Sequence, residues 1–184
     1  INFKIDYKII PFRGEYYNLK PSASYLVKNL IYPVPNPDFP FLGVHFTRRI
    51  NNSIESGPNA VFAFSREGYK MSMINLKELF ESISYIGFLK LIKLYWKEGI
   101  NEMYRSFSKQ AYLRSLQKLI PQIKISDISS GGAGVRAQAV KSNGEMVDDF
   151  LIISNNNIIN VCNAPSPAAT ASFAIGEHIT NLIK

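Results

Sequence analysis

Hydrophobic and polar positions alternate along the first part of the chain. KIDYKII and the aromatic-rich GEYYNL flank Pro11 and Gly14, which predicts two strand segments joined at a kink. SYLVKNLIYPVP predicts another strand. FLGVHFTRRI and SIESGPNAVFAFSREGY predict further strands on either side of a hairpin turn at Asn51-Asn52. Short strands separated by turn residues indicate an antiparallel sheet.

The hydrophobic period becomes helical at Asn75 and stays so nearly to Pro121. Asn75 is followed three residues later by Glu78, which resembles a capping box at a helix start. We expect Gly87 and Gly99 to divide this stretch into two or three helices. Pro121 should stop the last of them, because proline cannot continue a helix.

Short strands return after Pro121, with hairpin turns predicted at Asn143-Gly144 and in the run Asn155–Asn157. A final helix is expected to begin near Pro167, and its apolar face would carry Ile175, Ile179 and Ile183. The order of sheet, helices, strands and helix predicts an α+β fold.

Composition narrows the classes of function. The chain has 184 residues, 46% of them hydrophobic, which is typical of a packed globular protein. Its net charge of +7 comes from basic residues that are scattered along the sequence, so no clustered stripe indicates a nucleic-acid partner. The sequence contains no GxGxxG turn and no cluster with metal-ligand spacing.

The single cysteine, Cys162, excludes an internal disulfide framework and fits a reducing compartment. No apolar run has the length of a membrane span and no signal peptide is visible, so we expect a cytoplasmic location. The chain opens at Ile1 rather than at a methionine, in a segment with a strand pattern. We therefore expect it to be cut out of something longer.

Five stretches occur here in one order: IIPFRGEYYNL, LIYPVPNPDFPFLGVHFTRRI, SGPNAVFAFSREGY, GVRAQAV with VDDF, and NAPSPAATASFAIG. Together they resemble the C-terminal half of the FAD-dependent L-2-hydroxyglutarate oxidase/dehydrogenase family, within the D-amino-acid oxidase-like flavoproteins. The resemblance implies a substrate-binding lobe at residues 8–130 and flavin-contacting strands and helix at residues 131–184. It also implies that the Rossmann dinucleotide-binding portion is absent, so that FAD binding by this chain alone is weak or absent.

The resemblance gives a role to the small residues before the last helix. In such flavoproteins the N-terminus of this helix faces the pyrimidine edge of the flavin, and its dipole stabilises negative charge on the reduced ring. Pro167 would lie near the first helical position. The alternative is a capped helix whose alanines only pack tightly. The expected flavin contacts are Asn163, Ala164, Ser166, Ala168, Ala169 and Thr170.

A substrate with two carboxylates needs two cationic anchors, and arginine suits this task because its planar fork binds a carboxylate bidentately. Related oxidases carry an arginine in a Gly-x-Arg strand for the carboxylate beside the reacting carbon, which makes Arg136 in GVRAQ the first candidate. The alternative is a strand arginine paired with Asp148 or Asp149.

The second carboxylate has several candidate partners. Arg105 and Lys109 in YRSFSK lie four residues apart and can share a helix face. Tyr32 and Tyr16 offer hydroxyl donors, although strand tyrosines also pack in cores. The basic candidates are Arg48, Arg66, Arg105 and Lys109.

His45 in GVHFT is the candidate catalytic base, since a neutral imidazole can take the hydroxyl proton of a 2-hydroxy acid. The alternative is a structural histidine on a strand. His178 fits a structural role on the last helix. Asn160 stands where histidine is frequent in the family pattern, which puts activity or its pH dependence in question.

FLKLIKLYWK combines lysines with apolar residues, so this helix either rests on an anionic membrane, close to a quinone acceptor, or presents an ordinary solvated face. Two functions remain open. The first is the C-terminal part of an FAD-dependent enzyme that oxidises L-2-hydroxyglutarate or a similar 2-hydroxy acid. The second is a non-catalytic, separately encoded or degenerate half that binds a small dicarboxylate or a partner chain.

Overall fold

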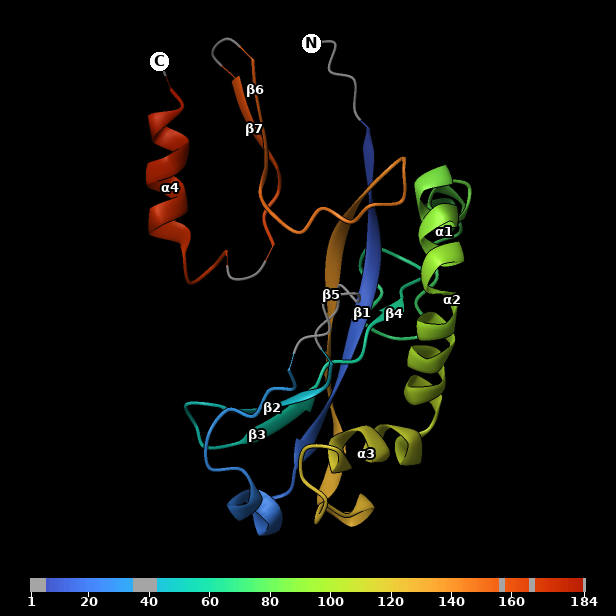
Figure 1. Ribbon diagram of the computed structural model, residues 1–184, viewed down its shortest axis with the longest axis vertical. Helices are drawn as coiled ribbons and strands as arrows, with labels where there is room; N and C mark the ends of the chain where they lie inside the picture. The colour runs from blue at the N-terminus through green and yellow to red at the C-terminus, as the bar shows by residue number, and fades with distance from the viewer. Residues whose placement is uncertain (1–5, 35–42, 156–157, 166–167, 184) are drawn as a thin grey trace.

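The computed structural model describes residues 6–34, 43–155, 158–165 and 168–183 (Figure 1). Helices and antiparallel sheets are mixed along the chain, which confirms the α+β class. The elements are β1 (Tyr7–Leu19), η1 (Pro21–Leu26), β2 (His45–Arg48), β3 (Ile54–Gly57), β4 (Val61–Phe62), α1 (Leu76–Ile83), α2 (Ile86–Phe107), α3 (Lys109–Gln117), η2 (Ile125–Asp127), β5 (Ile128–Lys141), β6 (Leu151–Asn155), β7 (Ile158–Asn163) and α4 (Ser172–Asn181).

β1 is the central strand of a five-stranded antiparallel sheet. One of its edges pairs with β5 along nearly the whole strand, from Tyr7 opposite Lys141 to Leu19 opposite Ile128. The other edge pairs with β4 near its middle and with β3 near its end, and β2 lies outside β3. The short strands therefore extend one edge of the long β1–β5 pair, with β4 near its middle and β3 near its end.

The prediction of two segments joined at a kink in β1 is wrong. The strand runs through Pro11 and Gly14, and its register with β5 shifts only between Glu15 and Tyr17. Gly14 permits a close approach rather than a turn, because a Cβ there would lie 2.6 Å from the Pro58 side chain.

The strand predicted from SYLVKNLIYPVP is also wrong. Pro21 begins the 3-10 helix η1, and the Ser24 hydroxyl donates to the Pro21 carbonyl at 2.8 Å. In the described part of this stretch, only an isolated bridge between Ile31 and Phe46 joins the sheet. Pro21 favours the first position of the 3-10 helix. Pro33 has no N–H to donate, so it interrupts the hydrogen bonds of a continuous strand.

The helical stretch is confirmed, and so is the cap at its start. The Asn75 side chain accepts hydrogen bonds from the backbone N–H groups of Lys77 and Glu78 at 3.1 and 3.2 Å. The reciprocal half of the predicted capping box is wrong, because the Glu78 carboxylate accepts from the Arg66 backbone at 2.7 Å. The Asn75 N–H donates instead to the Phe64 carbonyl.

Three helical elements form, and α2 has a kink at Tyr95, but glycines do not separate the elements. The breaks fall after Ser84 and at Ser108, whereas Gly99 lies inside α2, so its predicted role as a divider is wrong. Gly87 lies in the first turn of α2, where a Cβ would come within 2.2 Å of the Lys141 carbonyl of β5. The glycine thus lets α2 pack closely on the sheet.

Two hydrophobic clusters form the core. One lies between α3 and the end of the sheet near β2 and β3, and the other lies between the β1–β5 pair and the start of α2. The first includes Leu19, Val27, Phe46, Tyr112 and Leu116, and the second contains Ile10, Phe88, Leu91, Val140 and Met146. The predicted turn at Asn143-Gly144 follows β5 beside the second cluster. Gly144 has a positive φ of 93° in this turn.

The C-terminal part lies on the opposite side of the β1–β5 pair from α1 and α2 (Figure 1). β6 and β7 form the predicted antiparallel hairpin. α4 begins at Ser172, five residues after Pro167, which lies outside the described residues. No residue of α4 is buried, and Ile183 beyond its end is 68% exposed.

Candidate functional site

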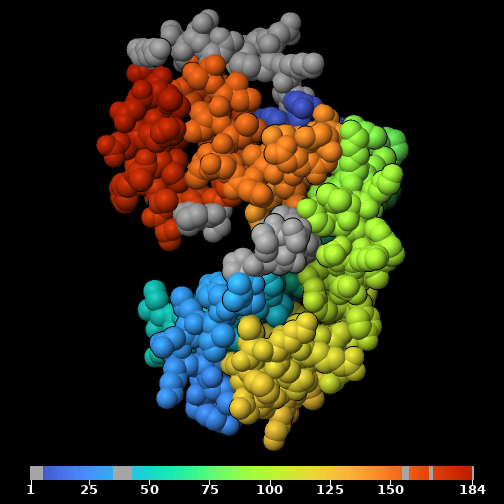
Figure 2. Space-filling model, viewed as in Figure 1, coloured from blue at the N-terminus to red at the C-terminus, as the bar shows by residue number. Residues whose placement is uncertain are grey.

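A cavity of about 920 Å³ lies where several separate parts of the chain meet. Its walls come from β1, β5, the start of β2 with the nearby Tyr32, residues 58–60, and residues 162–165. Figure 2 shows a hollow between the C-terminal part and the segments that contain β2 and β3. We call this space the central cavity.

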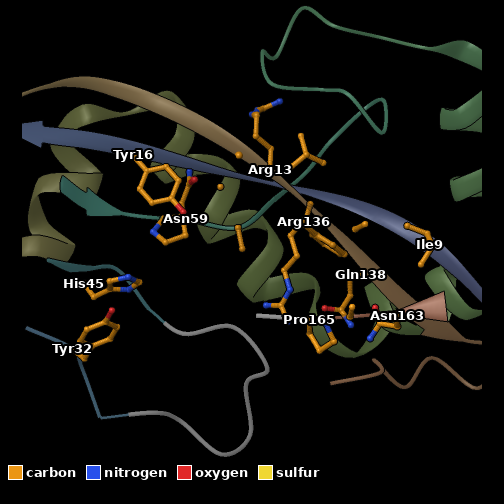
Figure 3. A pocket seen from close by; sticks show the side chains of 18 of the residues that line it. Ile9, Arg13, Tyr16, Tyr32, His45, Asn59, Arg136, Gln138, Asn163 and Pro165 are labelled. Atoms are coloured by element: carbon orange, nitrogen blue, oxygen red, sulfur yellow. The ribbon is translucent and has the colours of Figure 1, made fainter. Parts of the chain in front are cut away.

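His45 and Tyr32 lie at one end of the central cavity with their rings stacked at 4.3 Å (Figure 3). His45 Nδ1 lies 3.2 Å from the Gly43 carbonyl oxygen. A carbonyl only accepts, so this contact requires the proton on Nδ1 and leaves Nε2 as an acceptor. Burial lowers the pKa of His45 below its ordinary value of 6.5, although the Gly43 bond and Glu55 oppose the shift. The imidazole is therefore neutral at pH 7.

Arg136 extends from β5 into the cavity, and Gln138, Asn163 and Pro165 lie beyond the end of its side chain (Figure 3). Gln138 and Asn163 are 2% and 7% exposed, so both amides are buried in the cavity wall. Gln138 was missed from the sequence. Its signal was the alternation in RAQ, which puts Arg136 and Gln138 on the same side of a strand.

The segment Gly57-Pro58-Asn59 lines the cavity through Pro58 and Asn59. Asn59 is 3% exposed. Its amide oxygen accepts from the Glu15 backbone at 2.7 Å, and its nitrogen donates to the Glu15 carboxylate at 2.9 Å. The Ser106 hydroxyl donates to the same carboxylate at 2.5 Å. These bonds fasten the loop to β1 and α2.

Arg13 is a second residue that sequence reasoning missed. Its side chain is 1% exposed and forms an ion pair with Glu15 at 3.0 Å, while Nη2 also lies 3.2 Å from Met71 Sδ. Although it lines the cavity, Arg13 points away from Arg136 (Figure 3). Its burial and its ion pair indicate that it supports the Glu15 carboxylate.

All four basic candidates for the second carboxylate lie outside the central cavity. Arg66 forms an exposed ion pair with Glu81 at 3.1 Å. Arg48 Nη2 donates to the carbonyls of Val27 at 2.6 Å and Ser24 at 3.2 Å. Arg105 is paired with the buried Glu102 on α2. Lys109 Nζ donates to the Ile128 carbonyl at 2.8 Å. Sequence spacing could not reveal these partners, which are distant along the chain for Arg48 and Lys109.

Two of the predicted flavin contacts, Asn163 and Ala164, line the cavity, whereas Ala168, Ala169 and Thr170 do not. Ser166 lies outside the described residues.

Cys162 also lines the cavity and contacts the Asn160 carbonyl at 3.6 Å. A hydrogen bond with Cys162, together with burial, raises the pKa of Tyr7 to about 12. Asn160 itself is not among the described residues that line the cavity.

Comparison with known proteins identifies the family. The DAO family model, described as FAD dependent oxidoreductase, matches residues 2–182. The chain belongs to this family of FAD-dependent oxidoreductases.

Several relatives within the FAD-dependent oxidoreductases carry one name. An L-2-hydroxyglutarate dehydrogenase of Indibacter alkaliphilus is 59% identical over 94% of this chain and 43% of its own length. A mitochondrial L-2-hydroxyglutarate dehydrogenase of Caenorhabditis elegans is 52% identical, over 96% of this chain and 42% of its own. The enzyme of that name from Escherichia coli K12 is 45% identical over the same shares. The chain thus spans about 42% of the length of such relatives.

In the described part of the chain, no helix is both long and apolar enough to cross a membrane. Among the same residues, no group of three or more His, Cys, Asp and Glu side chains is arranged to hold a metal ion.

Proposed function

We propose that this chain is the C-terminal part of an FAD-dependent oxidoreductase that oxidises L-2-hydroxyglutarate to the 2-oxo acid. The observation that carries the proposal is the meeting of His45, Tyr32, Arg136 and Asn163 at one cavity. These residues come from parts of the chain that are far apart in sequence. The names of the similar proteins supply the substrate.

The proposal assigns residues 8–130 to a substrate-binding lobe and residues 131–184 to elements that contact flavin, although β5 crosses this boundary. The dinucleotide-binding half would then lie in the remainder of the complete protein. The central cavity is within the usual range of about 300–1,000 Å³ for ligand pockets. Gly134 lines it, and a Cβ there would meet nothing within 4 Å, which suits the approach of a flat ring to β5.

In the proposed mechanism, Arg136 binds the carboxylate beside the reacting carbon through two parallel N–H groups. Neutral His45 accepts the hydroxyl proton at Nε2, while the Gly43 carbonyl holds the ring in the required tautomer. Tyr32 stacks on the imidazole and fixes its plane. FAD, when bound, supplies the acceptor for the hydrogen that leaves carbon. The assignment of Arg48, Arg105 and Lys109 to the second carboxylate stays a prediction, and this mechanism does not use them.

The anchor role of Arg136 can be tested in the complete, flavin-loaded protein. We expect Arg136→Ala to raise KM for L-2-hydroxyglutarate roughly tenfold to a hundredfold, because a charged hydrogen-bonding pair contributes about 1.5–3 kcal/mol. Arg136→Lys should recover only part of this loss, since an ammonium lacks the planar fork. Arg114→Ala, which removes an exposed charge from α3, is the matched control.

Steady-state kinetics and flavin content would be measured for all three variants. Unchanged KM in a flavin-loaded Arg136→Ala protein would contradict the anchor. A rise in KM of the same size in Arg114→Ala would point to a general effect of net charge.

We further propose that α2 contacts an anionic membrane surface, where a quinone would accept the electrons. The supporting observation is that Lys90, Lys93 and Lys97 are exposed beside exposed apolar side chains of the same helix. These apolar residues are Leu89, Ile92, Leu94, Trp96 and Ile100. The basic and apolar groups match the two components of such a surface.

A further inference from the structure

The amide groups of Gln138 and Asn163 are both held by backbone carbonyls. Gln138 Nε2 donates to the carbonyl oxygens of Ala139 at 3.1 Å and Val147 at 2.9 Å. Asn163 Nδ2 donates to those of Val147 at 3.3 Å and Asp149 at 2.8 Å. The two amides therefore share the Val147 carbonyl and lie next to each other.

This arrangement determines which way each amide faces. A carbonyl oxygen can only accept, so the nitrogen of each amide must point at the backbone. The oxygen of each amide then points the other way. Among the described residues, neither Gln138 Oε1 nor Asn163 Oδ1 is one of the buried side-chain atoms without a hydrogen-bond partner. Both side chains line the central cavity, so their oxygens are acceptors on its wall.

Arg136 is the cation nearest to these acceptors along β5. Arg136 and Gln138 are alternate residues of one strand, so their side chains leave on the same side, about 7 Å apart at the backbone. Figure 3 shows the end of the Arg136 side chain next to Gln138 and Asn163.

A guanidinium has five N–H donors, and a bidentate carboxylate uses two of them. The remaining donors need partners if the group is to keep one orientation. A carboxylate partner would neutralise the guanidinium and compete with an anionic ligand, whereas an amide oxygen accepts without adding charge.

We propose that Gln138 and Asn163 are positioning residues for Arg136, which hold the guanidinium with neutral acceptors and add no negative charge beside the substrate carboxylate. This inference rests on the proposed function, because it needs Arg136 to bind a carboxylate.

The test is the binding of glutarate, a dicarboxylate without a hydroxyl to oxidise, to the complete flavin-loaded protein, measured by calorimetry. Gln138→Met removes one acceptor. Asn163→Ala removes the other. Each variant is made with Arg136 and in an Arg136→Ala background. Having two variants keeps the test decisive if one of them does not fold.

With Arg136 present, we expect either variant to weaken glutarate binding about threefold to tenfold, the usual effect of one hydrogen bond. In the Arg136→Ala background the same changes should alter affinity less than twofold. A purely structural role would lower affinity equally in both backgrounds, and this result would overturn the inference. Undiminished binding in the folded variants with Arg136 would also overturn it.

Failure of the proposed function has a different signature. If Arg136→Ala by itself leaves glutarate affinity unchanged, Arg136 is not the carboxylate anchor. The positioning role then falls with it. Loss of affinity on Arg136→Ala, combined with no coupling to Gln138 or Asn163, would retain the anchor and reject only its positioning residues.

Discussion

At the scale of single residues, His45 owes its chemistry to its surroundings. Burial lowers its pKa, the Gly43 carbonyl selects the Nδ1–H tautomer, and the Tyr32 ring holds the imidazole plane. The lowered pKa matters because only the neutral imidazole can accept a proton. His178, by contrast, is exposed on α4 and offers a control with the same chemistry.

The pH dependence of the reaction follows from the sign of this shift. We expect kcat/KM of the complete protein to fall as pH drops and His45 becomes protonated, with the acid limb centred below 6.5. His45→Gln should remove this limb and lower kcat about 10²–10⁴-fold, the usual contribution of a general base.

The profile would be measured by steady-state kinetics, with His178→Gln as the control. An acid limb that persists in His45→Gln would assign the proton acceptor elsewhere. A limb that moves in His178→Gln would show that the exposed histidine contributes.

At the scale of elements, α2 contains two glycines in opposite environments. A Cβ at Gly87 would meet the Lys141 carbonyl at 2.2 Å, whereas a Cβ at Gly99 would meet nothing within 4 Å. Replacing each glycine with alanine therefore separates the effect of packing, at Gly87, from the effect of helix propensity, at Gly99.

We expect Gly99→Ala to raise the free energy of unfolding by about 0.5–1 kcal/mol, because alanine loses less backbone entropy in a helix. Gly87→Ala should lower it by about 1–3 kcal/mol, since α2 must move away from β5. Denaturant unfolding followed by circular dichroism gives both values. Equal effects of the two substitutions would show that α2 does not pack on β5 as described.

At the scale of the whole molecule, charge and apolar surface are distributed unevenly. The net charge is +7, and three exposed lysines of α2 lie beside large exposed apolar side chains. Other exposed lysines lie away from this helix, at Lys20 and Lys28 around η1 and at Lys118 after α3. The two sets allow location to be separated from total charge.

We expect vesicles that contain phosphatidylglycerol to bind the complete protein, and a triple change of Lys90, Lys93 and Lys97 to glutamate to abolish cosedimentation. Each lysine near such a surface contributes about 1 kcal/mol. The matched control is the triple change to glutamate of Lys20, Lys28 and Lys118. Equal loss of binding in both variants would indicate a response to net charge alone and would contradict a docking role for α2.

The sequence was most informative where local chemistry decides the structure. Asn75 caps a helix through its own side chain, and Gly144 adopts the positive φ that a tight turn requires. The strand predicted over SYLVKNLIYPVP failed because its first three residues belong to the 3-10 helix η1 and Pro33 has no N–H for a strand ladder. Arg136 and His45 could be nominated from residue type and resemblance. Gln138 could not, because its amide gained a role only through the carbonyls around it.

The sequence by itself determined the α+β class, the helical middle of the chain and its caps and turns, since these depend on side chains within a few residues of one another. Tertiary structure alone decided that β1 runs unbroken beside β5, and that His45, Arg136 and Asn163 meet at one cavity. It also decided that Arg48 and Lys109 bond to distant carbonyls. The physical reason is that strand pairing and burial join residues far apart along the chain, and a local periodic pattern shows which face is buried but not which distant residue it meets.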